Sequence, residues 1–143
     1  MKIAMSGCFD MFHPGHRYIL MRAVKFAEDE GQVLVLINTD ESIKELKGKD
    51  RPKQNLEQRM EKIQNFIEKH NCPNIRMIPF TTEEELLFAY KVINPDIIVH
   101  GDDLVDITKA TGYGEFPFLL IPRQKTKNGE ELSTTAILKR KKN

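Results

Sequence analysis

Short apolar runs alternate along this chain with longer amphipathic stretches, and this alternation limits the fold more than any other feature. Runs of nearly continuous apolar character are typical of strands covered on both faces of a parallel sheet. Five runs are predicted as strands: KIAMSG near the start, VLVLIN from Val33, IRMIPF from Ile75, DIIVHG from Asp96 and FPFLLIP from Phe116. The pattern predicts an α/β fold: one Rossmann-like domain over residues 1–143, with a five-stranded parallel sheet and helices on both faces.

Helical periodicity fills the intervals between these runs. Apolar residues recur at helical spacing over residues 15–29 and 55–69. Thr82 and the three glutamates after it predict a helix start, since acidic side chains favour the N-terminal end of the helix dipole, and this helix should run to about Asn94. Ser133 or Thr134 can begin a short last helix. The polar stretches 44–54 and 124–131 are predicted to be loops.

The composition favours one ordinary globular domain and excludes several classes of partner. The chain has 143 residues, and its 22 Lys and Arg nearly balance 21 Asp and Glu, for a formal net charge of +1. Neither nucleic acid nor a membrane is therefore expected as a partner. No apolar run approaches the ~18 residues that span a bilayer, and the N-terminal segment turns polar too early for a secretory signal, so we expect a cytoplasmic location. Cys8 and Cys72 have no partner at metal-binding spacing and are interpreted as free thiols.

The densest concentration of polar chemistry is GCFDMFHPGH, which spans Gly7 to His16. It connects the first predicted strand to the first helix, where open α/β sheets bind ligands and a helix N-terminus favours phosphate. His13 and His16 lie near one face of that helix entrance, and Gly15 would let a phosphate approach the backbone. Their spacing could also suit a metal, but no third ligand has a readable spacing, so no protein metal ligand is assigned.

These residues carry a family resemblance. Gly7-x-Phe9-Asp10 followed by His13-x-Gly15-His16 resembles the phosphate-binding motif of the cytidylyltransferase-like nucleotidyltransferases. The segments 38–41, 46–52 and 56–59 resemble heptose-phosphate adenylyltransferases, and His100-Gly101-Asp102-Asp103 resembles the glycerol-3-phosphate and ethanolamine-phosphate cytidylyltransferases. Ser133-Thr134-Thr135 resembles the family's closing helix, whose N-terminus takes nucleotide phosphates. The resemblance covers essentially the whole chain in the right order.

The resemblance also implies residue roles. The catalytic residues would be His13, His16 and Lys47, with Lys44 as the alternative to Lys47. Nucleotide would be bound by residues of the first turn and of the later segments: Gly7, Cys8, Phe9, Asp10, Gly15, Asp103, Arg123, Ser133, Thr134 and Thr135. Acceptor substrate would be bound by Asp40, Lys44, Arg51 and Arg59. Two alternatives stay open: Asp10 could instead cap the first turn, and Arg59 could form a simple salt bridge. Arg123 departs from the family pattern, because Gln124 follows it and a longer loop separates it from Ser133.

The implied reaction is transfer of a nucleoside monophosphate, with CMP from CTP as first choice, to a phosphorylated small alcohol, polyol or sugar, releasing pyrophosphate. The alternatives are an adenylyltransferase that uses ATP and a sugar 1-phosphate, and a non-catalytic nucleotide-binding module. Mg²⁺ is the expected cofactor. By resemblance, a homodimer is the expected assembly.

Overall fold

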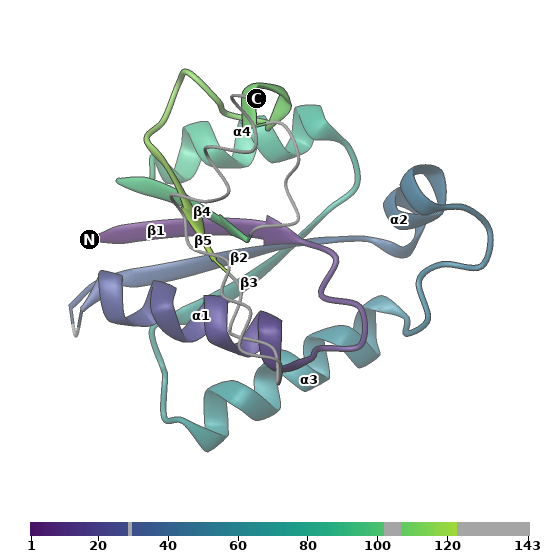
Figure 1. Cartoon of the computed structure of the whole chain (residues 1–143), viewed down its shortest axis with the longest axis horizontal. Coiled ribbons are helices and arrows are strands. Elements are labelled where there is room, and N and C mark those ends of the chain that lie inside the picture. The colour runs from purple at the N-terminus through teal and green to yellow at the C-terminus, as the bar shows by residue number, and fades with distance from the viewer. Residues whose placement is uncertain (29, 102–106, 123–143) are drawn as a thin grey trace.

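The structure is a computed structural model that describes residues 1–28, 30–101 and 107–122. Its elements follow one another as β1 (Lys2–Gly7), α1 (Pro14–Ala27), β2 (Gln32–Asn38), α2 (Asp40–Lys47), α3 (Leu56–Lys69), β3 (Ile75–Phe80), α4 (Glu83–Ile93), β4 (Ile97–Gly101), a short 3₁₀ turn at Ile107–Lys109, and β5 (Phe118–Ile121) (Figure 1). The five predicted strands are all confirmed, and their ends shift by at most a few residues.

The strands form one parallel sheet in the order β3-β2-β1-β4-β5. The chain moves outward from β1 to β3, then returns to the other side of β1 for β4 and β5. This reversal between β1 and β4 is a topological switch point, where ligands bind at the carboxyl ends of the strands. The predicted α/β Rossmann-like class is therefore confirmed.

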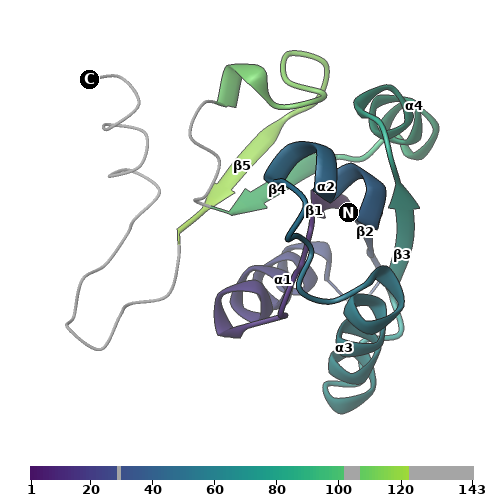
Figure 2. The same ribbon diagram turned by 90° about the vertical axis from the view of Figure 1, so that its right-hand side faces the viewer.

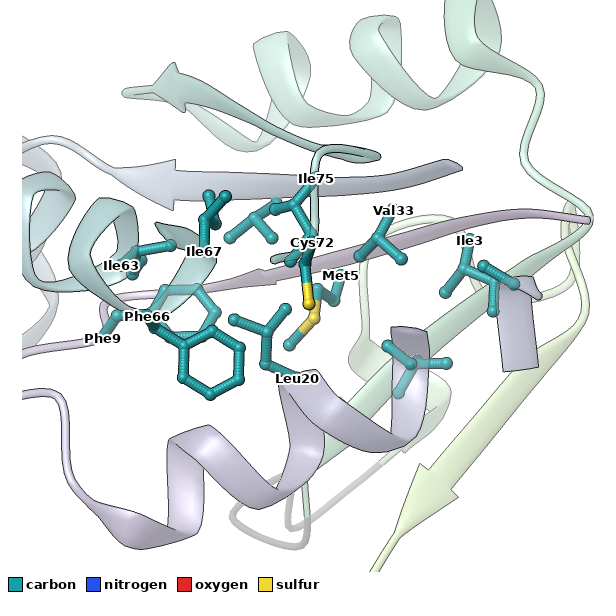
Figure 3. Close-up of a cluster of buried hydrophobic side chains, with 14 of the residues drawn as sticks. Ile3, Met5, Phe9, Leu20, Val33, Ile63, Phe66, Ile67, Cys72 and Ile75 are labelled. Atoms are coloured by element: carbon teal, nitrogen blue, oxygen red, sulfur yellow. The ribbon is translucent and has the colours of Figure 1, made fainter. Parts of the chain in front are cut away.

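Helices cover both faces of the sheet, with α1 and α3 on one face and α4 on the other (Figure 1). Alternation along each strand supplies both cores: Ile3 and Met5 of β1 join the cluster beneath α1 and α3, whereas Ala4 joins the cluster beneath α4. Figure 3 shows the first cluster, in which Cys72 packs among isoleucine and phenylalanine side chains. Burial raises the pKa of the Cys72 thiol.

Two of the predicted helix ends can be explained from their caps. The Thr82 hydroxyl accepts the Glu85 backbone N–H and begins α4, and the helix ends at Asn94, which adopts a left-handed φ of 52°. Asn55 and Gln58 form a reciprocal capping box that begins α3. These local signals are visible in the sequence, and the structure confirms both predicted starts.

The prediction of a loop over residues 44–54 is wrong in its first part. Residues 44–47 form the second half of α2, which Thr39 caps by accepting the Ser42 backbone N–H at 3.4 Å. Only Ser42 and Ile43 of this helix are buried, so α2 lacks the apolar stripe that marks the other helices.

The short 3₁₀ turn at Ile107–Lys109 was not predicted from the sequence. The predicted loop 124–131 and the last helix from Ser133 or Thr134 lie outside the described residues. No helix in the described part of the chain has the length and apolar character needed to cross a bilayer.

Candidate functional site

A pocket of about 1010 Å³ opens where the strands end at their carboxyl termini. Figure 2 looks toward this end of the sheet, with α2 in front of β1 and β2. All five strands contribute residues to the pocket. Its polar and charged lining comprises Ser6, Cys8, Asp10, His13, His16, Asn38, Ser42, Glu45, Lys47, Arg51, Thr81, Thr82, Glu83, Tyr90, His100, Lys109 and Thr111. The switch point of the sheet therefore coincides with this pocket.

The turn from β1 to α1 forms one wall of the pocket. Phe9 and Met11 have left-handed φ values of 52° and 53°, which non-glycine residues rarely adopt. Burial of the Phe9 ring in the core holds the first of these positions. A Cβ on Gly7 would come within 3.3 Å of that ring, so a glycine lets the turn close tightly. Strain of this kind is common where a backbone must present side chains to a ligand.

His13 and His16 form a capping box at the N-terminus of α1. The Nδ1 of His13 accepts the Gly15 backbone N–H at 3.1 Å, and the Nδ1 of His16 accepts the His13 backbone N–H at 3.2 Å. An Nδ1 that accepts a hydrogen bond cannot carry a proton, so in each neutral ring the proton lies on Nε2. Both rings line the pocket. The backbone therefore selects the tautomer in which Nε2 is an N–H donor.

Aromatic packing fixes the orientation of the two imidazoles. Their rings stack with centroids 3.7 Å apart and an interplanar angle of 20°. Phe12 stacks on His16 at 5.9 Å, and Phe9 meets His16 edge-on at 5.5 Å. Phe12 is itself held by Phe66 of α3, 5.8 Å away. The histidine pair is thus built on the core rather than on a mobile loop.

Gly15 has a structural task beyond the approach of phosphate predicted from the sequence. A Cβ at this position would lie 2.8 Å from Cε1 and 3.0 Å from Nδ1 of His13. The imidazole ring occupies the space that any larger side chain would need. Gly15 therefore allows the capping geometry of His13.

The structure separates the two lysines between which the sequence left a choice. Lys47, in the last turn of α2, lines the large pocket, and its positive charge acts to lower the pKa of the Cys8 thiol. Lys44 lies one turn earlier and lines a smaller pocket of about 310 Å³ together with Asp40 and Gln58. Lys47, and not Lys44, thus lines the pocket that His13 and His16 also line.

Cys8 follows β1 directly and lines the pocket. Its Sγ donates to Asn38 Oδ1 at 3.7 Å. Burial raises the pKa of the Cys8 thiol, and the positive charges of Lys47, Arg59 and Arg51, with a hydrogen bond from Lys47, offset only part of this rise. The group is therefore a neutral thiol near pH 7.

Asp10 and Arg51 join the first turn to the segment before α3. The Asp10 carboxylate accepts Arg51 Nε at 3.2 Å and the backbone N–H groups of Lys53 and Gln54 at 2.8 and 2.9 Å. Burial acts to raise the pKa of Asp10, but these three donors outweigh it and hold the pKa below its ordinary value. The Asp10 carboxylate therefore orders the backbone before α3, and the cap of α1 is His13 and not Asp10.

Arg59 forms the salt bridge that was one of its two predicted roles. Its side chain has no exposed area, and Nη2 donates to Asp40 Oδ1 at 2.7 Å. The same guanidinium donates to the carbonyl oxygens of Cys8, Asn38 and Gln54 at 2.8, 2.7 and 3.1 Å. Arg59 thus connects the ends of β1 and β2 to α2 and α3, and it does not line the large pocket.

Sequence reasoning missed the pocket wall formed by the ends of β2 and β3. Asn38 ends β2, and Thr81, Thr82 and Glu83 follow β3 directly. Tyr90 of α4 is buried and also lines the pocket. Burial raises the pKa of its hydroxyl group to about 12, although a hydrogen bond with Ser6 acts to lower it. The signal was available, because polar residues that follow parallel strands share one edge of the sheet.

Several predicted site residues lie outside the described residues: Asp103, Arg123, Ser133, Thr134 and Thr135. Within residues 1–28, 30–101 and 107–122, no group of three His, Cys, Asp or Glu side chains could hold a metal ion. Both carboxylate oxygens of Asp10 are already occupied by protein donors.

A family model described as cytidylyltransferase-like matches residues 4–140. The chain belongs to the cytidylyltransferase-like family. Among curated relatives, the bifunctional protein HldE of Haemophilus influenzae (strain PittEE) is 36% identical over 103 residues, which cover 71% of this chain and 20% of that protein. HldE of Gluconobacter oxydans (strain 621H) is 33% identical over 101 residues, 71% of this chain and 19% of that protein. The chain spans about a fifth of the length of the curated relatives it matches. These matches indicate nucleotidyltransferase activity for this member of the cytidylyltransferase-like family.

Solved structures resemble this family member in fold. The lipopolysaccharide core biosynthesis protein from Thermoplasma volcanium GSS1 superposes with a TM-score of 0.64 at 20% identity, covering 87% of this chain and 98% of that one. The universal stress protein from Archaeoglobus fulgidus gives a TM-score of 0.52 at 11% identity, covering 84% and 92%. At such identities, the likeness concerns the Rossmann-like fold alone.

Proposed function

We propose that this chain transfers a nucleoside monophosphate from a nucleoside triphosphate to a phosphorylated small alcohol, polyol or sugar, acting as one nucleotidyltransferase domain over residues 1–143. The observation that carries the proposal is the capping box of His13 and His16, which uses Nδ1 of each ring and leaves Nε2 as the N–H donor of two side chains that line the same pocket as Lys47. Donors held before a ligand arrives stabilise charge that develops in a transition state.

The reaction needs no protein nucleophile. A phosphate oxygen of the acceptor attacks the α-phosphorus in line, an O–Pα bond forms, and the bond from Pα to the bridging oxygen breaks so that pyrophosphate leaves. The acceptor phosphate is already an anion, so the protein has to align the reactants and offset crowded negative charge. His13, His16 and Lys47 are groups of this kind, and Mg²⁺ would enter with the triphosphate.

CTP is the first nucleotide to test and ATP is the second. The His100-Gly101-Asp102-Asp103 segment and Pro122-Arg123 favour CTP through their likeness to cytidylyltransferases. The GCFD and LKGKDRP segments favour ATP and a sugar 1-phosphate through their likeness to heptose-phosphate adenylyltransferases. The cytoplasmic location and the homodimer expected from the sequence belong to the same proposal.

The test has two stages. A thermal-shift panel of CTP, ATP, GTP and UTP with Mg²⁺ identifies the nucleotide, because selective binding to the native state raises the melting temperature. Pyrophosphate release, with mass spectrometry of the product, is then measured against a panel of phosphate monoesters. Nucleotide-dependent stabilisation and an acceptor-dependent product support the proposal. Binding with no product from any acceptor would favour the non-catalytic module instead.

A further inference from the structure

Tyr90 of α4 is a buried polar side chain at the edge of an apolar cluster. The residue is 1% exposed, and it packs in the cluster beneath α4 together with Leu86, Phe80 and Ile98. Tyr90, Leu86 and Phe80 also line the large pocket. The core on this face of the sheet therefore ends at the pocket, and Tyr90 brings a hydroxyl group to that boundary.

Neighbouring residues hold the Tyr90 ring in one place. The Phe116 ring meets it at a centroid distance of 6.2 Å and an interplanar angle of 64°. A Cβ on Gly112 would come within 3.3 Å of Tyr90 Cδ2, so the backbone before β5 packs closely against the ring. The Tyr90 carbonyl oxygen accepts the Asn94 backbone N–H at 2.7 Å, which fixes this turn of α4 at the helix end. The fold therefore sets the position of the hydroxyl group before a ligand arrives.

Ser6 of β1 is the polar neighbour of this hydroxyl group. Alternation along β1 puts Ser6 on the same face of the sheet as Ala4, which belongs to the cluster beneath α4. A hydrogen bond with Ser6 acts to lower the pKa of Tyr90, although burial raises that pKa to about 12. A donor has this effect on a phenolate oxygen, so Ser6 donates and the neutral Tyr90 keeps its own proton. Among the residues that the structure describes, Ser6 is the only hydrogen-bond partner of this hydroxyl group, so its proton is available to a ligand.

The histidine pair lies on the other side of the sheet edge. His13 and His16 cap α1, which covers the face opposite to α4 (Figure 1). The end of β1 separates the two places, and Ser6, Gly7 and Cys8 of this end line the pocket. A ligand whose phosphate lies at the histidine pair can therefore extend across the end of β1 to the hydroxyl group of Tyr90.

We propose, resting on the proposed function, that Tyr90 and Ser6 determine specificity by binding one hydroxyl group of a substrate whose phosphate lies at His13 and His16. The Tyr90 hydroxyl donates to the oxygen of that group, and the group donates in turn to Ser6 Oγ. A carbonyl oxygen could only accept, and the apolar neighbours of Tyr90 disfavour a charged group. The nucleotide can offer a ribose hydroxyl and the acceptor a hydroxyl of its own. A site built for a hydroxyl group rejects an analogue that lacks it, because the protein hydroxyls are then left unpaired.

Deoxy analogues and one conservative variant test the inference by calorimetric titration. Tyr90→Phe removes only the hydroxyl group and keeps the ring that packs in the core. One arm compares CTP and ATP, with Mg²⁺, against their 2′-deoxy and 3′-deoxy forms. The other arm uses the complex with a non-hydrolysable nucleotide and compares the phosphate monoester that gives product with its deoxy forms. We expect the wild type to bind the complete substrate about tenfold or more tighter than one deoxy form in one of the two arms, which identifies the source of the hydroxyl group. Tyr90→Phe should lose that preference.

Control variants separate ligand binding from a purely structural role. Tyr18→Phe and Tyr113→Phe remove hydroxyl groups from tyrosines that do not line the pocket, and both should keep the wild-type preference. Ser6→Ala should weaken the same preference as Tyr90→Phe, and the two effects should not add, because both hydroxyls hold one ligand group. A lower melting temperature of Tyr90→Phe with its preference unchanged would overturn the inference, and so would equal binding of complete and deoxy forms in both arms. Absence of product from every phosphate monoester would instead overturn the proposed function, and the nucleotide arm would then decide alone whether Tyr90 binds a hydroxyl group.

Discussion

The Nδ1 atom of His16 accepts the backbone N–H of His13 at 3.2 Å while the two rings stack 3.7 Å apart, so each histidine helps to position the other. The pair is at once a helix cap and a source of donors to the pocket. The cap uses Nδ1 of each ring, and the proposed function would use Nε2. Substitutions can therefore separate the two roles.

His16→Ala should reduce turnover by about 10²-fold or more, because one preorganised donor to the transition state is lost. The fold should persist, since Phe9 and Phe12 remain packed in the core. His13→Asn provides a finer comparison, because asparagine is a good N-cap residue and preserves the acceptor for the Gly15 N–H. It should retain stability while losing turnover. Normal turnover by His16→Ala in a steady-state pyrophosphate assay would show that the site is wrongly assigned.

Gly15→Ala should damage catalysis without unfolding the protein. Alanine favours a helix over glycine by about 1 kcal/mol, which offsets the loss of a cap of similar size. The new Cβ would require His13 to move, since it would lie 2.8 Å from Cε1. We expect a melting temperature near that of the wild type and a large fall in kcat. A variant with wild-type kcat would mean that the ring position of His13 does not matter.

The sequence predicted the sheet and the histidine pair because both depend on local patterns. Apolar runs identify strands directly, and the Gly7 to His16 motif lies within one turn. Helix α2 was partly missed because only Ser42 and Ile43 of it are buried, which leaves no apolar period to read. Its Thr39-Asp40-Glu41 start was nevertheless a legible cap signal.

Arg59 shows a different limit of sequence reasoning. It lies three residues after Leu56 and four before Ile63, so its place on the apolar face of α3 could have been read from spacing. What spacing could not show is that carbonyl oxygens from Cys8 and Asn38 converge there. Those partners are far apart in sequence and meet only after β1 and β2 have paired. These tertiary contacts make Arg59 a buried connector between strands and helices.

Arg59→Met should destabilise the protein by about 3 kcal/mol or more, because it leaves buried carbonyl groups and Asp40 without their donor. Urea unfolding measures this loss. Lys62→Met is the matched control, since it removes the same charge from an exposed position on α3 and should change the midpoint little. A small effect of Arg59→Met would show that the four-way connection contributes little to stability.

Lys47→Ala should lower turnover by about 10²-fold through loss of a cation at the phosphates. The same change should raise the pKa of the Cys8 thiol further, because Lys47 both offsets the burial effect and hydrogen bonds to that side chain. The rate of Cys8 alkylation against pH, measured in a Cys72→Ala background, reports this shift. Lys44→Ala is the comparison: if it, and not Lys47→Ala, abolishes turnover, the assignment of the catalytic lysine is reversed.

Asp10 predicts a specific acid dependence of stability. Its pKa in the folded protein lies below the ordinary value of 3.8, so the carboxylate stabilises the fold fully above that value. As the pH falls from there through the folded-state pKa, the unfolded chain takes up the proton first, and the contribution of Asp10 to the free energy of unfolding disappears.

The variant Asp10→Asn should lower the free energy of unfolding by about 1–3 kcal/mol near pH 7. One amide oxygen cannot replace two carboxylate oxygens that accept from Arg51, Lys53 and Gln54. In urea unfolding between pH 7 and 3, the gap between the wild type and Asp10→Asn should stay constant at first and narrow only below about pH 4. A gap that stays constant throughout would show that the Asp10 pKa is not lowered by folding.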